Sequence, residues 1–179
     1  MTYDILSRLA GRSISSPSDI LIQGFTSANT GKSVTGALLK VDIAHSICDG
    51  LVIYVGKETD NQYVVMVEYS PSKWIRYCNL NSVSVKINQK VGQNDIIGSC
   101  YKHTLRFEYC NLQQSNHIVR ISNITCYKHD PLGILYGLEE LPNIPSTIYV
   151  PSETMKVVSE RPLNNYADNL SSSINSPGR

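Results

Sequence analysis

The residues of this chain that are able to do chemistry are scattered along its length. Gly31-Lys32-Ser33 resembles the end of a phosphate-binding loop, but Thr26 stands five residues earlier, where that motif requires glycine. We therefore interpret this segment as a polar surface loop. No two carboxylates have a spacing suited to acid–base catalysis, and no Ser/His/Asp or Cys/His set emerges from the sequence.

The histidines and cysteines also lack the spacing of a metal site. The 5 cysteines are odd in number and include no C-x-x-C pair, so neither a disulfide framework nor a zinc site is indicated. We expect them to be small buried hydrophobic side chains. They are Cys48, Cys78, Cys100, Cys110 and Cys126.

The charge and hydropathy of the chain exclude several classes of partner. The formal net charge is +1, and Lys and Arg occur without a basic cluster, so no nucleic-acid partner is predicted. No apolar run reaches the length of a membrane helix, and no membrane span is expected. The first eight residues lack the basic and apolar regions of a signal peptide. We therefore expect a protein that is made in a cytoplasm.

The elements that must position any site are short β-strands. Runs rich in β-branched and aromatic residues follow one another from about residue 50 onward, separated by polar turns. This pattern predicts an all-β domain with an antiparallel sandwich or rolled sheet. The expected strands are 51–55, 63–69, 74–78, 82–87, 96–98, 105–109 and 118–121.

Composition divides the chain into three parts. Residues 1–35 read as an N-terminal arm, 36–137 as the β domain, and 138–179 as an extended arm rich in Pro and Ser. The sequence leaves open whether the first arm packs on its own domain. Apolar residues among the prolines of the second arm are candidate partner-binding anchors: Ile144, Ile148, Tyr149, Val150 and Met155.

The middle domain resembles the lysostaphin-type (LytM-like) zinc endopeptidases. Six short elements occur in the order that this family shows, and together they cover roughly residues 36–135. The resemblance implies the lysostaphin-like peptidase fold. The matching segments are Leu38-Leu39-Lys40-Val41-Asp42-Ile43-Ala44, Asp49-Gly50-Leu51-Val52-Ile53, Tyr77-Cys78-Asn79-Leu80, Lys90-Val91-Gly92-Gln93-Asn94-Asp95-Ile96-Ile97-Gly98, Thr104-Leu105-Arg106-Phe107-Glu108 and Asp130-Pro131-Leu132.

The same resemblance implies that the zinc site of the family has been lost. The three ligand positions are occupied by Leu38, Asp42 and Arg106, and the two positions of the helper histidines by Asn79 and Thr104. A catalytic zinc site needs three protein donors. Leucine has no lone pair, and the guanidinium of arginine is always protonated. We therefore expect no cofactor, no metal and no catalytic residues, and we regard these five positions as vestigial.

Three expectations follow for the charged residues around these positions. We expect the guanidinium of Arg106 to replace zinc as the counter-charge of Asp42. His103 lies one residue ahead of the family's histidine register, so on a strand its side chain should point away from the former site. Glu108 is expected to be an ordinary strand carboxylate.

These features favour a non-enzymatic assembly protein. Degenerate domains of this family resemble parts of bacteriophage tails and baseplates, so the resemblance implies a structural subunit of the virion tail, close to the baseplate or tail-tip hub. Such a protein would be made in the host cytoplasm. Its partners would be other tail and baseplate subunits, which the arms would bind by strand addition or by draping across them.

Two alternatives remain at this stage. Zinc-free members of the family also resemble regulators that bind and activate a cell-wall hydrolase, although those normally carry an export signal and a coiled coil. An active zinc endopeptidase would need ligands that the five positions do not supply. The sequence also leaves open a vestigial contact between the old groove and peptidoglycan.

Overall fold

The computed structural model describes residues 3–25, 35–121 and 123–138, and it confirms the predicted antiparallel all-β, lysostaphin-like fold. Two short helices accompany the strands: α1 (Asp4–Ala10) and α2 (Leu132–Leu135). The strands are β1 (Leu21–Gln23), β2 (Ala37–Lys40), β3 (Ile43–His45), β4 (Gly50–Lys57), β5 (Tyr63–Ser70), β6 (Lys73–Val83), β7 (Lys90–Val91), β8 (Ile96–Cys100), β9 (Thr104–Asn111), β10 (Ile118–Ile121) and β11 (Ile124–His129).

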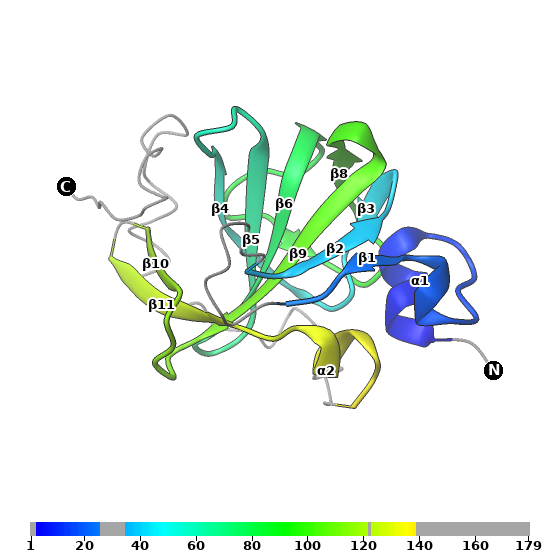
Figure 1. Ribbon diagram of the computed structural model, residues 1–179. Helices are drawn as coiled ribbons and strands as arrows, with labels where there is room; N and C mark the ends of the chain where they lie inside the picture. The colour runs from blue at the N-terminus through cyan, green and yellow to red at the C-terminus, as the bar shows by residue number, and fades with distance from the viewer. Residues whose placement is uncertain (1–2, 26–34, 122, 139–179) are drawn as a thin grey trace.

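Strands β6 and β9 form the centre of the sheet. The main path runs β1-β2-β9-β6-β5-β4-β7, and every pairing in the described part of the chain is antiparallel. The hairpin of β10 and β11 joins the sheet through β9, and the pair of β3 and β8 joins it through β6. Figure 1 shows α1 beyond β1 on one side of the sheet and the β10–β11 hairpin on the opposite side.

One predicted strand, 82–87, is not found as such. Strand β6 extends through Val83, after which the backbone turns. Asn88 has a φ of 77°, and the Lys86 N–H donates to Oε1 of Gln89 at 3.0 Å. Asparagine tolerates this left-handed conformation better than β-branched residues do. Turn chemistry therefore overrides the alternating hydrophobic pattern of this segment.

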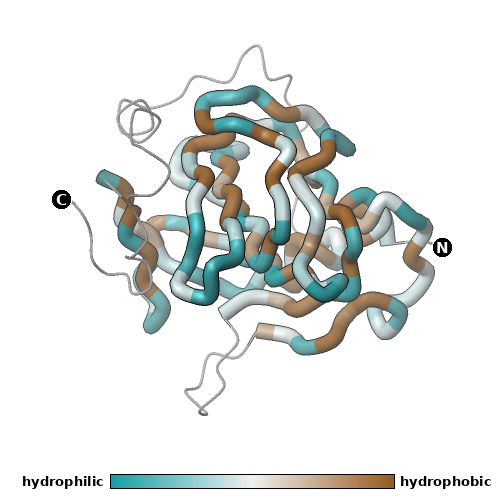
Figure 2. The backbone as a smooth tube through the Cα atoms, turned by 90° about the horizontal axis from the view of Figure 1, so that it is seen from above, coloured by the Kyte–Doolittle hydropathy of each residue, from teal (hydrophilic) through white to brown (hydrophobic). Residues whose placement is uncertain are grey.

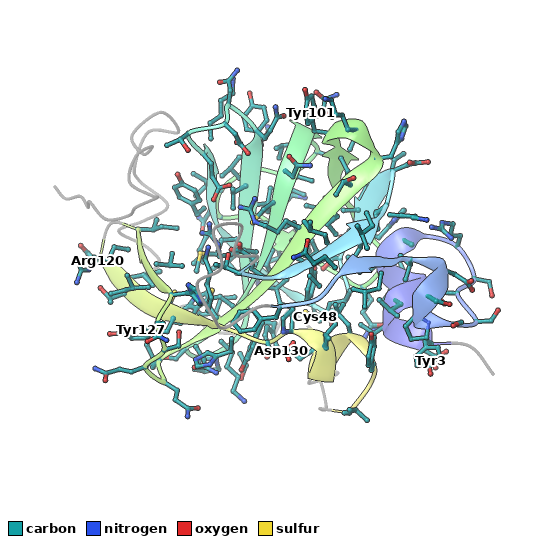
Figure 3. The ribbon with its side chains drawn as sticks, viewed as in Figure 1. Tyr3, Cys48, Tyr101, Arg120, Tyr127 and Asp130 are labelled. Carbon is teal, nitrogen blue, oxygen red and sulfur yellow. The ribbon has the colours of Figure 1, made fainter. Side chains whose placement is uncertain are left out.

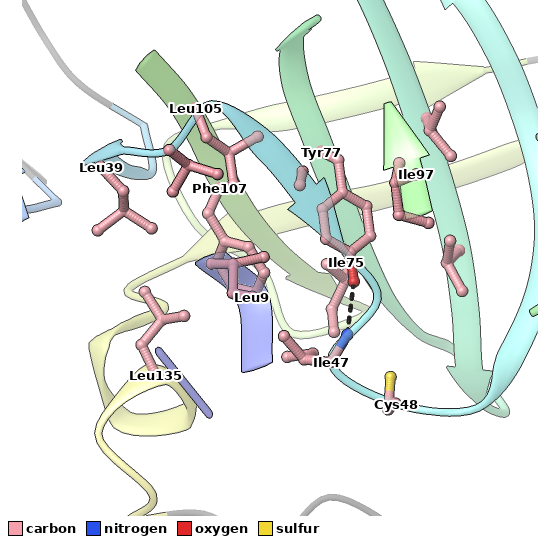
Figure 4. Packing of buried hydrophobic residues seen from close by; sticks show 14 of the residues in the cluster. Leu9, Leu39, Ile47, Cys48, Ile75, Tyr77, Ile97, Leu105, Phe107 and Leu135 are labelled. Atoms are coloured by element: carbon pink, nitrogen blue, oxygen red, sulfur yellow. Dashed lines mark hydrogen bonds between the residues drawn. The ribbon is translucent and has the colours of Figure 1, made fainter. Parts of the chain in front are cut away.

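The larger hydrophobic core lies on one face of β6 and β9. Tyr77 and Phe107 contact each other edge to face, with ring centroids 5.8 Å apart, and both are fully buried. The hydroxyl of Tyr77 accepts a hydrogen bond from the Ile47 N–H at 3.3 Å (Figure 4). Leu9 and Leu135 bring the two helices into the same core. Both helices thus pack against the larger cluster.

A second, smaller cluster lies on the opposite face of the same central strands. Successive residues of a strand point to opposite faces, so Trp74 and Cys110 belong to this cluster while Ile75 and Tyr109 belong to the first. The β10–β11 hairpin covers this second face and keeps Arg120 on the outside (Figure 3). Figure 2 shows hydrophobic stretches along the strands of the sheet and hydrophilic stretches in the turns between them.

The N-terminal segment packs on the domain, which answers the question that the sequence left open for residues 3–25. Leu6 and Leu9 of α1 are fully buried in the first core, together with Ile14. Strand β1 pairs with β2. The anchors expected in the C-terminal arm, residues 144–155, and the Gly31-Lys32-Ser33 segment lie outside the described residues.

The cysteines are buried, as predicted. Burial, with a smaller contribution from the charge of Asp49, raises the pKa of the Cys48 thiol to about 12. Desolvation also raises the pKa of Cys100 to about 12. These two thiols therefore stay protonated near neutral pH and act as small hydrophobic side chains. No helix in the described ranges is long and apolar enough to cross a membrane.

Substitution of Gly11 by alanine is expected to destabilise the fold. Gly11 ends α1 with a φ of 70°, and an added Cβ would lie 2.5 Å from Cε1 of His45. Gly137 offers a matched control, because its φ is also positive (77°) but no atom lies within 4 Å of an added Cβ. In urea denaturation, Gly137→Ala should cost about 1–2 kcal/mol for the left-handed backbone alone. Gly11→Ala should cost roughly 1–3 kcal/mol more than Gly137→Ala, because the added Cβ overlaps the His45 ring. Equal losses of unfolding free energy in the two variants would contradict this role of the contact with His45.

Candidate functional site

Two of the five positions that we predicted to be vestigial lie directly opposite each other in the sheet. Leu38 of β2 pairs with Arg106 of β9, and Arg106 pairs on its other side with Cys78 of β6. Paired residues of an antiparallel sheet place their side chains on the same face. This face also carries Arg76 and Glu108, which pair with each other across β6 and β9. We call it the charged face.

Asn79 and Thr104 are also brought together. Asn79 interrupts the pairing of β6 with β5 and has a φ of 69°. Its side-chain amide donates to the Thr104 carbonyl at 2.8 Å and to the Tyr101 carbonyl at 3.1 Å. Tyr101 lies at the end of the sheet beside β8 (Figure 3). Asn79 therefore holds the turn that leads into β9, which is a structural task for a side chain at a helper-histidine position.

The predicted ion pair between Asp42 and Arg106 is wrong. Asp42 follows β2, whereas Arg106 lies opposite Leu38, four residues earlier, which is a separation of roughly 13 Å along a strand. The Asp42 side chain is 76% exposed, and its Oδ1 atom lies 2.7 Å from Nδ1 of His103. Arg106 instead contacts Glu58 and Glu108.

We predicted that His103 points away from the former site because of its place on a strand, but His103 does not lie on a strand. It ends the 3₁₀ turn η2 (Tyr101–His103), in which Lys102 and His103 both have positive φ values, 53° and 56°. The alternation of side chains along a strand therefore does not apply to it. The His103 carbonyl accepts from the Val41 N–H at 3.1 Å, which keeps the turn beside Asp42.

The charged face is organised by a network of ion pairs. Glu108 accepts from Nε of Arg76 through Oε1 and from Nε of Arg106 through Oε2, each at 2.8 Å. Glu58 contacts Nη2 of the same two arginines, with its Oε2 atom 3.2 Å from Arg76. Lys128 of β11 lies 3.1 Å from Oε2 of Glu108. We call these five residues the ionic network.

Glu108 is the most buried member of the network, with a fully inaccessible side chain. Burial opposes its ionisation most strongly, but the charges of Lys128, Arg106 and Arg76 outweigh that penalty and hold the pKa of Glu108 well below its usual range. Thr35 adds a further hydrogen bond to Oε2, at 2.9 Å. The expectation that Glu108 is an ordinary strand carboxylate is therefore wrong.

The sequence contained only part of the signal for this network. Arg106 and Glu108 are two residues apart on a predicted strand and therefore had to share a face. Nothing in the spacing pointed to Arg76, Glu58 or Lys128, which come from β6, from the turn after β4 and from β11. The pairing of β6, β9 and β11 brings these distant residues together.

The comparisons with known proteins agree with this architecture. Residues 29–117 match the model of peptidase family M23. Residues 29–117 thus resemble an M23, lysostaphin-like peptidase domain. None of the curated proteins matches the chain.

Several solved structures share the fold. Lysostaphin superposes with a TM-score of 0.54 at 15% identity, over 75% of this chain and 57% of lysostaphin. CbpA from L. salivarius REN gives 0.50 at 19% identity, over 64% of this chain and 84% of CbpA. Helicobacter pylori Csd3 gives 0.50 at 16% identity, over 78% of this chain and 36% of Csd3. This chain thus spans little more than half of lysostaphin, and the similarity concerns the fold.

The residues at the ligand positions do not fit the zinc ion that an M23 domain implies. Arg106 directs a permanent positive charge into the charged face, where a ligand would have to offer a lone pair. Asp42 is engaged with His103 instead of facing Leu38 and Arg106. No group of three metal-binding side chains occurs among the described residues. The donor set thus provides no basis for a step through zinc.

Replacing Glu108 by glutamine is expected to cost about 3–5 kcal/mol in unfolding free energy, because it leaves buried cations without their shared counter-charge. The measurement is urea denaturation at pH 7. Asp60→Asn is the control, since the Asp60 side chain accepts a hydrogen bond from the exposed Gln62 N–H. A loss in Glu108→Gln no larger than that of the control would show that the network does not stabilise the fold.

The contribution of Glu108 to the free energy of unfolding should also be lost at acidic pH. A carboxyl group whose folded-state pKa lies below its unfolded value stabilises the fold fully above the unfolded pKa, which is about 4.3 for glutamate. The difference in unfolding free energy between the wild type and Glu108→Gln should therefore be constant from pH 8 to 6. It should narrow once the pH falls below about 4. A gap that widens in acid would contradict the assigned direction of the pKa shift.

Proposed function

We propose that this chain is a non-enzymatic assembly protein that uses an inactive M23-type domain as a scaffold. The observation that carries this proposal is Arg106, which stands at a ligand position with its guanidinium held by Glu58 and Glu108. Such a group can neither bind a metal nor accept a proton near neutral pH. Leu38 opposite it offers no donor either.

The assembly that we propose is a bacteriophage tail, with the chain in or near the baseplate or tail-tip hub of the virion. Support comes from the sequence: a domain without the family's ligands is combined with a Pro- and Ser-rich segment carrying spaced apolar residues. Segments of this composition suit binding to neighbouring subunits, because they bury little surface on their own. Other tail and baseplate subunits would be the partners.

Elemental analysis tests the non-enzymatic part of the proposal. The purified chain, dialysed against buffer with excess zinc and then against metal-free buffer, should retain well below one zinc ion per chain. An active lysostaphin carried through the same procedure is the positive control. Stoichiometric zinc in this chain, lost on replacing Asp42 by alanine, would overturn the proposal.

Affinity capture from the native host or from infected cells tests the assembly part. We expect tail-tube, hub or baseplate proteins among the partners identified by mass spectrometry. A chain truncated after residue 138 should lose them if the C-terminal segment carries the contacts. Capture of a cell-wall hydrolase would contradict the virion assignment and favour a regulator, with the old groove as the partner surface.

A further inference from the structure

Glu58 differs from Glu108 in how it is held, although both carboxylates bridge the same two arginines. Glu108 belongs to the centre of β9 and is inaccessible to solvent. Glu58 follows the end of β4, and its side chain is 17% exposed. Glu108 is therefore a fixed part of the sheet, whereas Glu58 reaches the network from a surface turn.

The two arginines form a fork that suits a carboxylate. Glu108 binds both Nε atoms from one side, which orients the guanidinium groups of Arg76 and Arg106 relative to each other. Each then presents Nη2 to the same carboxylate, that of Glu58. The Arg76 side chain is only 3% exposed, so its conformation is set by the fold. Paired guanidinium donors of this kind are a common means of recognising carboxylates.

The charges of the network favour an anion at the Glu58 position. Arg76, Arg106 and Lys128 supply three positive charges, and Glu108 alone would neutralise only one of them. If the turn moved away with Glu58, the fork would carry an excess of positive charge in a partly buried setting. Such an excess attracts a negatively charged group and disfavours an empty site.

The backbone hydrogen bonds of the turn that carries Glu58 are local, whereas its ion pairs reach the two arginines of the fork. The Glu58 N–H donates to the Gln62 carbonyl at 3.0 Å, and the Asn61 N–H donates to the Glu58 carbonyl at 2.9 Å. Asp60 closes the turn through the Gln62 N–H. These bonds join residues 58–62 to one another, next to the pairing of β4 with β5, which begins at Lys57 and Tyr63.

We propose that Arg76 and Arg106 form a carboxylate-binding site, which Glu58 occupies within the chain and which a carboxylate of a peptide partner enters when the turn moves aside. The site would accept a C-terminal carboxylate or an acidic side chain, since both present the same two oxygens. It arises from the geometry of the charged face and is independent of the virion assignment.

The experiment uses the full chain with Glu58 replaced by alanine and sodium acetate as the probe. Acetate is titrated at pH 7 against a sodium chloride series of equal ionic strength, while the Nε–Hε signals of Arg76 and Arg106 are followed by NMR. We expect saturable shifts of both signals in Glu58→Ala and at least tenfold weaker binding in the wild type. Acetate should also raise the melting temperature of Glu58→Ala more than chloride does.

Two further variants make the result decisive. Asp60→Asn removes a negative charge from the same turn but keeps the side-chain acceptor of the Gln62 N–H, so it should respond to acetate as the wild type does. Glu58→Gln keeps the size of the side chain without its charge and serves if the alanine variant does not fold. The proposal is overturned if neither Glu58 variant responds to acetate more than the wild type, or if chloride acts equally.

Discussion

The carboxylate of Glu108 has no access to solvent, and burying a charge in this way is costly unless opposite charges and hydrogen bonds surround it. Arg76, Arg106 and Lys128 provide those charges from three strands, β6, β9 and β11. The ion pairs can form only if β9 lies between the other two strands, in the register observed. The position of Glu108 thus ties the charged face to the topology of the whole sheet.

The ionic network reverses the electrostatics of a metal centre. In a zinc site, a cation gathers side chains that offer lone pairs. Here two carboxylates, Glu58 and Glu108, bind three cationic side chains, and the result is a largely buried cross-link between strands that keeps one positive charge in excess. The M23-like fold of this chain therefore accommodates a charged side chain at Arg106, a position that the sequence aligns with a ligand of the family. In our proposal, the position of the turn that carries Glu58 decides whether a partner reaches Arg76 and Arg106.

Sequence reasoning succeeded where local pattern is decisive. Runs of β-branched and aromatic residues correctly indicated β4, β5 and β9, because such residues pack well in a buried, pleated strand. It failed at residues 82–87 and at His103, where left-handed backbone positions end or interrupt the strand. It failed again for Asp42, because spacing in a family motif does not state which side chains face each other.

The order of residue types was enough to establish the all-β class, the resemblance to M23 peptidases and the absence of a usable donor at Leu38 and Arg106. These are properties of single residues and of short periodic segments. The partners of Arg106, the burial of Glu108 and the bridge made by Glu58 depended on the three-dimensional fold. Glu58 and Arg106 are 48 residues apart in the chain. Strand pairing brings residues that far apart in the chain into contact, and it is governed by cooperative burial over the whole sheet and not by local sequence.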